Sequence, residues 1–268
     1  MGNHVIERTW ERMLEPVCIF GNLYFVGTIP ASTHILKTKD GLIMFDSGYQ
    51  ETLYMVIDNM YRLGLNPYDI KMIIHTHGHV DHFGATAALQ KMTGAKAGIA
   101  ELDKTYVTGE ENLSWADELD LTLIPFTPDF IYTDGDVLSF GGVDIKCIAT
   151  PGHTPGTTSF VFDVTDGEKT LTACLLGGVG FNSMQKSFLK KYNLSEDTRN
   201  AFPDSMDRFG AIEADIFLGN HAVNNNTPEK IERVLNGEKD AFICKGENKE
   251  FAEHTKQRYL DMIKGENL

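Results

Sequence analysis

The sequence predicts an α+β protein in which two packed β-sheets are flanked by helices. Two observations lead to this fold class. Short runs rich in β-branched and aromatic residues form two blocks, one in each half of the 268-residue chain, and each block ends in segments with helical spacing. We find no internal repeat, low-complexity segment or linker, so we expect a single domain spanning residues 1–268.

The first block begins as a meander of strands and continues as strand, helix, strand. The turn sequence Lys39-Asp40-Gly41 separates two of the β-rich runs and is typical of a hairpin. The first helical segment ends at a glycine before Asn66-Pro67. The expected strands are 17–28, 32–40, 41–48, 71–76 and 95–100, and the expected helices are 51–65 and 85–94.

The second block follows a looser, aromatic-containing segment at 108–132. Asp134-Gly135 and Gly141-Gly142 mark turns between its strands. The expected strands are 137–140, 143–150, 157–164, 169–176 and 214–219, and the expected helices are 195–213, 228–235 and 249–264.

Composition narrows the possible partners. The formal net charge of −14 would repel a phosphate backbone, so nucleic acid is not an expected partner. No apolar run reaches the roughly 20 residues of a membrane helix, and the N-terminus lacks the apolar core of a secretory signal. We therefore expect a cytoplasmic protein, or a secreted or periplasmic one if a leader has been trimmed. The four cysteines lie far apart and predict neither a disulfide framework nor a cysteine zinc cage.

The most informative stretch is THGHVDHFG at 76–84, directly after the apolar run KMIIH. It places His77, His79, Asp81 and His82 just past the end of a strand, where a loop can turn side chains toward one point. Imidazole and carboxylate are good zinc ligands, and the absence of cysteine favours an open site over a closed structural cage. The alternative is a polar surface loop, which the next two histidines disfavour.

Two single histidines lie at equivalent places further along the chain. His153 falls in the turn ATPGHTPG between two expected strands, and His221 follows the strand ADIFLG. A lone histidine is more often structural than metal-binding. Here all three patches follow the carboxyl ends of strands, which a sandwich would bring to one edge, so we expect a shared site.

These motifs resemble the metallo-β-lactamase superfamily. THGHVDH matches its THxHxDH signature, and the resemblance extends from NLYFVGT and LIMFDSG through DGDVLSFGGV and TPGHTPGTTSF to FLGNHA. It implies an αββα sandwich with a metal site at one edge of two mixed sheets. By this resemblance His77, His79 and His153 would hold one zinc ion, and Asp81, His82 and His221 a second. Asp46 would orient a ligating histidine.

The set of five histidines and one aspartate is similar to that of the third subclass of metallo-β-lactamases, known as B3. Many relatives outside that subclass carry an aspartate bridging both metals, and this chain lacks it. Cys174 is the nearest replacement, although its position inside an apolar strand favours a core role. Gly177, Gly178 and Gly180 stand where the subclass carries substrate-binding serines. These glycines either let the backbone approach a substrate or form a strained turn.

The resemblance implies a hydrolase in which a hydroxide bridging two zinc ions attacks an acyl C–N or C–O bond, with Asp81 orienting the hydroxide. β-Lactam ring opening is the first expectation, and a lactonase or thioesterase of the same superfamily is the alternative. Manganese, iron or cobalt could replace zinc. The expected partner is a small molecule, and the sequence does not indicate an oligomeric state. The candidates for an apolar pocket rim are Phe83, Trp115, Phe126, Phe130, Tyr132 and Phe181, and a place in the core is the equal alternative for each of them.

Overall fold

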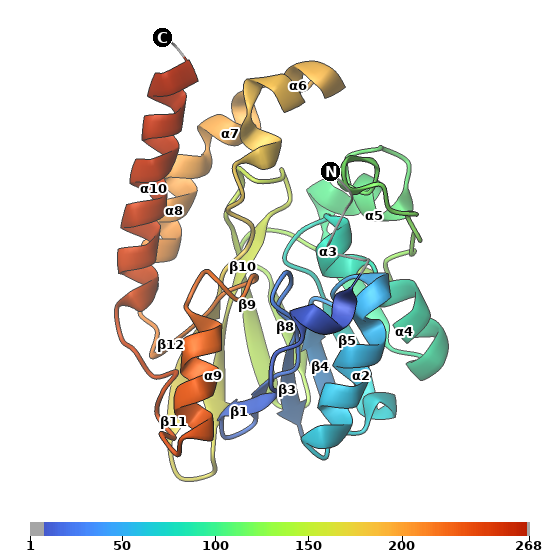
Figure 1. The fold of residues 1–268 in the computed structure, drawn as a ribbon, viewed down its shortest axis with the longest axis vertical. Coiled ribbons are helices and arrows are strands. Elements are labelled where there is room, and N and C mark those ends of the chain that lie inside the picture. Colours follow the sequence, from blue (N-terminus) through green and yellow to red (C-terminus); the bar gives the residue numbers. More distant parts are fainter. Residues whose placement is uncertain (1–7, 267–268) are drawn as a thin grey trace.

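The computed structural model describes residues 8–266 and shows four layers, helix, sheet, sheet and helix (Figure 1). The expected α+β class and αββα arrangement are confirmed. His4 lies outside the described residues. No helix in the described part of the chain combines the length and apolarity needed to cross a membrane.

The first sheet has seven strands and is antiparallel in its first half and parallel in its second. Its order is the order of the sequence, β1 to β7. The strands β1 to β4 form the expected meander, in which Thr38 pairs with Gly41 at the predicted hairpin. The strands β4 to β7 run parallel. Their bounds are β1 Val17–Phe20, β2 Leu23–Phe25, β3 His34–Thr38, β4 Gly41–Phe45, β5 Ile70–Ile74, β6 Lys96–Ala100 and β7 Phe130–Tyr132.

The second sheet has five strands in the order β12-β11-β10-β9-β8. All neighbours are antiparallel except β11 and β12, which run parallel because the helices of the C-terminal half connect them. The bounds are β8 Val137–Phe140, β9 Val143–Ala149, β10 Thr158–Thr165, β11 Thr170–Leu175 and β12 Ile216–Leu218.

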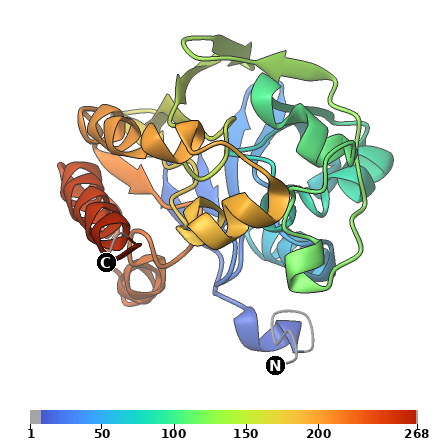
Figure 2. The ribbon, with the colours of Figure 1, turned by 90° about the horizontal axis from the view of Figure 1, so that it is seen from above.

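Helices cover the outer face of each sheet and the edge where the histidine loops emerge (Figures 1 and 2). The helices are α2 Leu53–Arg62, α3 Val80–Phe83, α4 Thr86–Thr93, α5 Lys104–Thr108, α6 Lys186–Tyr192, α7 Asp197–Asn200, α8 Phe202–Gly210, α9 Thr227–Leu235 and α10 Glu247–Glu266. The helix expected at 195–213 is in fact two, because Ala201 separates α7 from α8 and Pro203 occupies the first turn of α8, where a missing N–H costs nothing. The helix α6 was not expected.

Three apolar clusters hold the layers together. Between the sheets, the ring of Phe45 stacks on that of Phe162 at 4.7 Å and 12°. Met44 on the other face of the first sheet packs with α2 and α4, and Phe217 of the second sheet packs with Phe209 of α8 and with α10. Alternate residues of a strand face opposite sides, so each sheet buries both faces.

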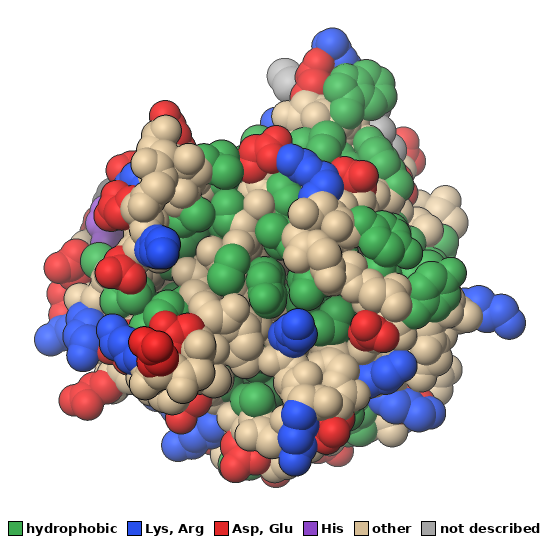
Figure 3. Space-filling view, turned by 90° about the horizontal axis from the view of Figure 1, so that it is seen from below, with side chains coloured by type: hydrophobic (Ala, Val, Ile, Leu, Met, Phe, Trp, Pro, Cys, Tyr) green, Lys and Arg blue, Asp and Glu red, His purple; other side chains and the backbone are tan. Residues whose placement is uncertain are grey.

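The face opposite α6 is a mixed surface (Figure 3). Lys and Arg side chains lie among Asp and Glu side chains there, with hydrophobic side chains scattered between them. The acidic excess of the chain is therefore not gathered into one patch on this face.

Candidate metal centre

Three loops bring the predicted histidines together at the edge between the sheets. His77 and His79 follow β5, and His82 lies in the short helix α3. His153 comes from the loop between β9 and β10, and His221 follows β12. Strands of both sheets end at this edge, so His82 and His221, which are 139 positions apart in the sequence, become neighbours.

The first cluster consists of His77, His79 and His153. Their ligand atoms all lie within 4.8 Å of one another, and His79 Nδ1 is 2.9 Å from His153 Nε2. All three side chains are buried. His77 Nε2 has no hydrogen-bond partner among the described residues, although it is shielded from solvent. A buried nitrogen without a partner costs free energy, which a bound cation would recover.

The second cluster consists of Asp81, His82 and His221. Asp81 Oδ2 lies 3.2 Å from His82 Nε2 and 3.6 Å from His221 Nε2, and the two imidazole nitrogens are 3.4 Å apart. The ligand atoms of Asp81 and His82 also lie within 4.8 Å of that of His77, so the two clusters adjoin.

Hydrogen bonds at Nδ1 fix the orientation of three of these imidazole rings. Nδ1 of His82 contacts Asp46 at 2.7 Å, that of His153 contacts the Gly180 carbonyl at 2.7 Å, and that of His221 contacts the Pro30 carbonyl. A carbonyl or carboxylate can only accept, so Nδ1 carries the proton in each ring. In the neutral ring Nε2 is then a bare acceptor directed at its neighbours, which is the state a metal requires.

Burial and the close approach of imidazoles depress the basicity of the first cluster. Burial, reinforced by neighbouring imidazoles, lowers the pKa values of His77 and His79 well below their usual range. Burial also lowers the pKa of His153, to about 4. These rings are therefore neutral at pH 7 and ready to ligate a cation.

His82 shows the opposite behaviour. Burial alone would lower its pKa, but the carboxylates of Asp81 and Asp46 outweigh burial and raise this pKa to about 10. A positive charge is thus favoured between the two carboxylates. A bound cation would satisfy the same field in place of the proton.

Asp46 supports both the loop and His82. It follows β4 at a φ of 54°, a left-handed conformation that Asp tolerates better than most residues. One carboxylate oxygen accepts from the Thr76 backbone N–H at 2.7 Å, and the other accepts from the Thr76 hydroxyl and faces His82. Asp46 thus links the Thr76 backbone to the His82 ring.

Asp103 is a supporting residue that the sequence reasoning missed. Its fully buried carboxylate accepts from the Gly78 N–H at 2.8 Å, from the Thr154 hydroxyl at 2.6 Å and from the Gly156 N–H at 2.6 Å. It therefore ties the loop of His77 and His79 to the loop of His153. Burial, only partly offset by these hydrogen bonds, raises the pKa of Asp103 to about 6. Asp103 could have been suspected from the sequence because it lies just past β6, whose carboxyl end lies at the same sheet edge as the clusters.

Of the glycines after β11, Gly178 packs against His153 and Gly177 packs against Thr157. A Cβ on Gly178 would lie 2.2 Å from His153 Cδ2, and one on Gly177 would lie 2.5 Å from Thr157 Cγ2. Neither glycine has a positive φ, so the strained-turn interpretation does not hold. The close backbone approach is real, but in the structure it is made to the imidazole of His153.

Five of the six residues expected at the pocket rim pack in the core instead. Phe83 and Phe126 are buried in the apolar cluster between the first sheet and its helices. The centroids of their two rings are 5.8 Å apart. Tyr132 lies between the sheets and donates its hydroxyl proton to the His75 carbonyl. The remaining two, Phe130 and Phe181, pack against other core residues. These aromatic side chains serve the core because strand alternation and helix packing turn them inward.

Cys174 and His75 also have structural roles. Cys174 is fully buried among apolar side chains under α8 and α10, and burial raises its pKa, which opposes ligation by a thiolate. His75 faces away from the clusters, with its ring nitrogens 2.7 Å from the Gly98 carbonyl and from the Thr86 hydroxyl.

Trp115 is the expected rim residue that does lie beside the clusters. Its ring is 6.2 Å from that of His79 and stacks on Phe188 of α6 at 5.3 Å and 12°. Glu118 on the same loop bonds Lys191 and the Tyr192 hydroxyl of α6, each at 2.6 Å. The loop and α6 thus form one continuous wall near the first cluster.

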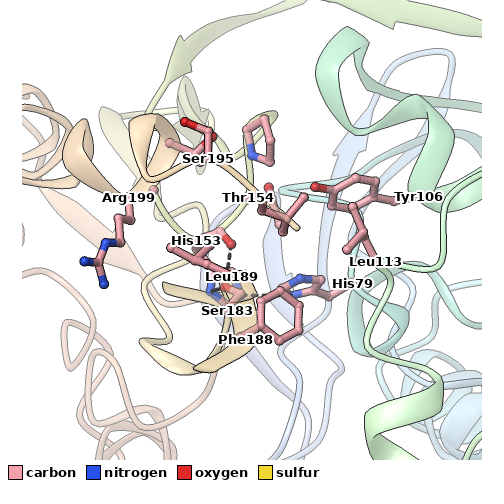
Figure 4. A pocket seen from close by; sticks show the side chains of 14 residues that line it. His79, Tyr106, Leu113, His153, Thr154, Ser183, Phe188, Leu189, Ser195 and Arg199 are labelled. Atoms are coloured by element: carbon pink, nitrogen blue, oxygen red, sulfur yellow. Dashed lines mark hydrogen bonds between the residues drawn. The ribbon is translucent and has the colours of Figure 1, made fainter. Parts of the chain in front are cut away.

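A cavity of about 90 Å³ adjoins the first cluster (Figure 4). His79 and His153 form part of its wall. The rest of the wall is largely apolar and includes Tyr106, Leu113, Pro155, Phe188, Leu189 and Leu194. The cavity therefore reaches two histidines of the first cluster.

Comparison with known proteins agrees with this geometry. The profile of the family described as "Metallo-beta-lactamase superfamily" matches residues 26–166. BJP-1, a subclass B3 metallo-beta-lactamase of Bradyrhizobium japonicum, is 25% identical, with a TM-score of 0.84 over 98% of both chains. A probable metallo-hydrolase of Bacillus subtilis, YflN, is 25% identical over 75% of this chain and 80% of its own length.

A third relative is named for its hydrolase activity. Hydroxyacylglutathione hydrolase GloC of Haemophilus influenzae is 31% identical over 53% of this chain and 65% of its own. Among these curated relatives, the matched stretch spans between 22% and 80% of the relative's length. With the profile covering more than half of this chain and the fold matching throughout, the protein belongs to the metallo-beta-lactamase superfamily.

Proposed function

We propose that this protein is a dinuclear zinc-dependent hydrolase of an acyl C–N or C–O bond, with β-lactam ring opening of the B3 type as the first candidate reaction. The observation that carries the proposal is the convergence of six ligand-type side chains at one sheet edge. They are His77, His79, His153, Asp81, His82 and His221. The similarity to BJP-1 along the whole chain supports it.

His77, His79 and His153 would hold one cation, and Asp81, His82 and His221 the other. Bound divalent cations lower the pKa of water and polarise an acyl carbonyl. Five imidazoles and a carboxylate suit zinc, and Mn²⁺, Fe²⁺ or Co²⁺ are possible replacements.

The chain itself supplies orientation and a proton acceptor. Asp81 Oδ2 faces His82 and His221, whereas its other oxygen makes no hydrogen bond within the described residues. That oxygen is available to accept a hydrogen bond, and then a proton, from the attacking water. Asp46 holds His82 in the orientation described above, so the imidazoles need no rearrangement during the reaction.

A lactonase or thioesterase is the second candidate, and a specific observation favours it. Gly178 packs so closely on His153 that it has no room for a serine side chain, and so this position cannot supply a hydroxyl to a β-lactam carboxylate. The similarity to hydroxyacylglutathione hydrolase GloC points in the same direction.

The test is hydrolysis of nitrocefin and a carbapenem by zinc-reconstituted protein, with and without a chelator. Efficient turnover that the chelator abolishes would establish β-lactam hydrolysis. Weak turnover of both, with two zinc ions bound per chain, would move the assignment to acyl-lactones and glutathione thioesters, assayed next on the same preparation. Absence of chelator-sensitive turnover of every substrate in the panel would refute the hydrolase proposal.

A further inference from the structure

A buried chain of hydrogen bonds runs from β6 to the residues that follow β4. His75 Nδ1 is 2.7 Å from the Gly98 carbonyl oxygen of β6, and His75 Nε2 is 2.7 Å from the Thr86 hydroxyl oxygen. The Thr86 hydroxyl is in turn 2.9 Å from the hydroxyl of Ser47. The side chains of His75, Thr86 and Ser47 are fully buried. The reaction proposed above uses none of them.

The partners at the two ends of this chain determine where its protons lie. The Gly98 carbonyl can only accept, so His75 carries a proton on Nδ1. Burial lowers the pKa of His75, so the ring is neutral and its Nε2 is an acceptor. The Thr86 hydroxyl therefore donates to Nε2, and its oxygen accepts from the Ser47 hydroxyl. Each member of the chain has one role, which restricts its rotation.

The chain ends beside His82 of the second cluster. The Ser47 backbone N–H donates to the His82 carbonyl at 2.7 Å, and the Ser47 hydroxyl oxygen lies 3.2 Å from the same carbonyl oxygen. The preceding residue, Asp46, contacts Nδ1 of the His82 ring at 2.7 Å. Positions 46 and 47 therefore hold His82 both by its backbone and by its ring.

The backbone of Asp46 depends on such support. Its left-handed conformation, with a φ of 54°, persists only where the surrounding structure holds it. Ser47 is the next residue, and its side chain cannot rotate without losing the hydrogen bond to Thr86. The chain from His75 therefore helps to fix the carboxylate that contacts the His82 ring.

The Thr86 hydroxyl is engaged over a long range rather than within its own helix. Thr93, at the other end of α4, shows the local alternative, because its hydroxyl donates to the Leu89 carbonyl at 2.8 Å. Thr86 instead joins His75, which follows β5, to Ser47, which follows β4.

We propose that His75 is a positioning residue for the second cluster and acts through the hydroxyl groups of Thr86 and Ser47 on the orientation of His82. This inference rests on the proposed dinuclear site, because it assigns a residue that prepares one of the two clusters for its metal ion. His75 itself does not contact that ion. Partners behind a ligating histidine fix the direction of its ring and thereby the affinity for the metal.

The first experiment uses the metal-free full chain and histidine ¹⁵N NMR. Thr86→Val keeps the shape of the side chain and removes the middle hydroxyl. We expect it to shift the Nε2 resonance of His75, which loses its donor, and the ring resonances of His82. Thr86→Ser keeps a hydroxyl and should restore the wild-type spectrum. This measurement does not depend on turnover, so it tests the chain even if the hydrolase proposal fails.

The second experiment is a zinc titration in which His79 and His221 report separately on the first and second clusters. Thr86→Val should weaken zinc binding at the second cluster about 10-fold and leave the first cluster within 2-fold of the wild type. His75→Phe should have the same effect. The double variant should be no weaker than either single variant, because both substitutions break one chain.

Thr93→Val is the matched control. It removes a hydroxyl from the same helix, together with the hydrogen bonds of that hydroxyl to the Leu89 carbonyl and from the Ala95 N–H. Both clusters of this variant should bind zinc as in the wild type. The inference would be overturned by unchanged His82 resonances in Thr86→Val, by equal weakening of both clusters, or by a Thr86→Ser variant as weak as Thr86→Val.

Discussion

The carboxylate of Asp103 accepts a hydrogen bond from the backbone N–H of Gly78, with an oxygen–nitrogen distance of 2.8 Å. Gly78 stands between His77 and His79, so this bond fixes the backbone between two residues of the first cluster. Asp103 also bonds the loop of His153, which makes it the shared anchor of both loops.

Replacing this anchor should loosen the first cluster. Asp103→Ala leaves buried donors of Gly78, Thr154 and Gly156 without their acceptor, and we expect a loss of about 3 kcal/mol in the free energy of unfolding. Urea unfolding of the metal-free protein measures this loss, and metal analysis should show reduced occupancy after dialysis. A variant with wild-type stability and metal content would show that Asp103 does not anchor the loops.

Removing a ring from the first cluster should remove a cation. His79→Ala takes away the nitrogen that lies 2.9 Å from His153 Nε2, so we expect about one zinc fewer per chain and loss of hydrolysis. Zinc content and turnover are measured on the same preparation. His254→Ala, on the exposed face of α10, should match the wild type in both. Retention of both metals and of full rate by His79→Ala would contradict the ligand assignment.

A side chain at Gly178 should displace His153. The Cβ of Gly178→Ala would lie 2.2 Å from His153 Cδ2, and the ring cannot move without breaking its bond to the Gly180 carbonyl. Loss of this orientation should weaken zinc binding about 10- to 100-fold, as measured by competition with a chromogenic chelator. Gly265→Ala in α10, with no atom near the new Cβ, is the control and should bind zinc normally.

His34 should make the fold sensitive to acid. Burial, partly offset by Asp46, lowers the pKa of His34 from 6.5 to about 4. A histidine with a depressed pKa in the folded state contributes stability above pH 6.5 that is lost as the pH falls toward 4, here about 3 kcal/mol. His34→Leu carries no proton at either pH. Its free energy of unfolding should therefore fall by about 3 kcal/mol less than that of the wild type between pH 7 and 4.

Chemical denaturation of the metal-free protein at a series of pH values measures this difference. The histidines of the two clusters contribute equally to the pH dependence of both proteins. The difference between the two stability profiles therefore reports on His34 alone. His254→Gln should retain the wild-type profile because its side chain is exposed. Parallel profiles for wild type and His34→Leu would contradict the prediction.

The fold and the grouping of the histidines could be predicted from the sequence because their signals are local. A strand end followed by His77, His79, Asp81 and His82 is visible in a few residues, and parallel strands deliver their ends to one edge. The short helix α6 escaped prediction because its seven residues show little periodicity and its Phe188 packs on a distant partner, Trp115.

The supporting residues could not be predicted because their partners are distant in the sequence. Asp103 acts on positions 25 and 51 residues away, a relation that only the packed sheets reveal. The predicted aromatic rim was wrong for the same reason. The sequence around an aromatic residue on a loop or short strand is the same whether its side chain faces a pocket or the core. Phe126 packs inward on Phe83, whereas Trp115 remains beside His79.

The side chains of each cluster lie on segments that the ribosome synthesises at well-separated times. His79 and His153 are separated by 74 positions, and His82 and His221 by 139, so no early portion of the nascent chain holds a complete ligand set. The two sheets must dock before either cation finds all its ligands. Metal loading would then be the last step of maturation, and the finished apoprotein, rather than the growing chain, would select the metal from the cellular pool.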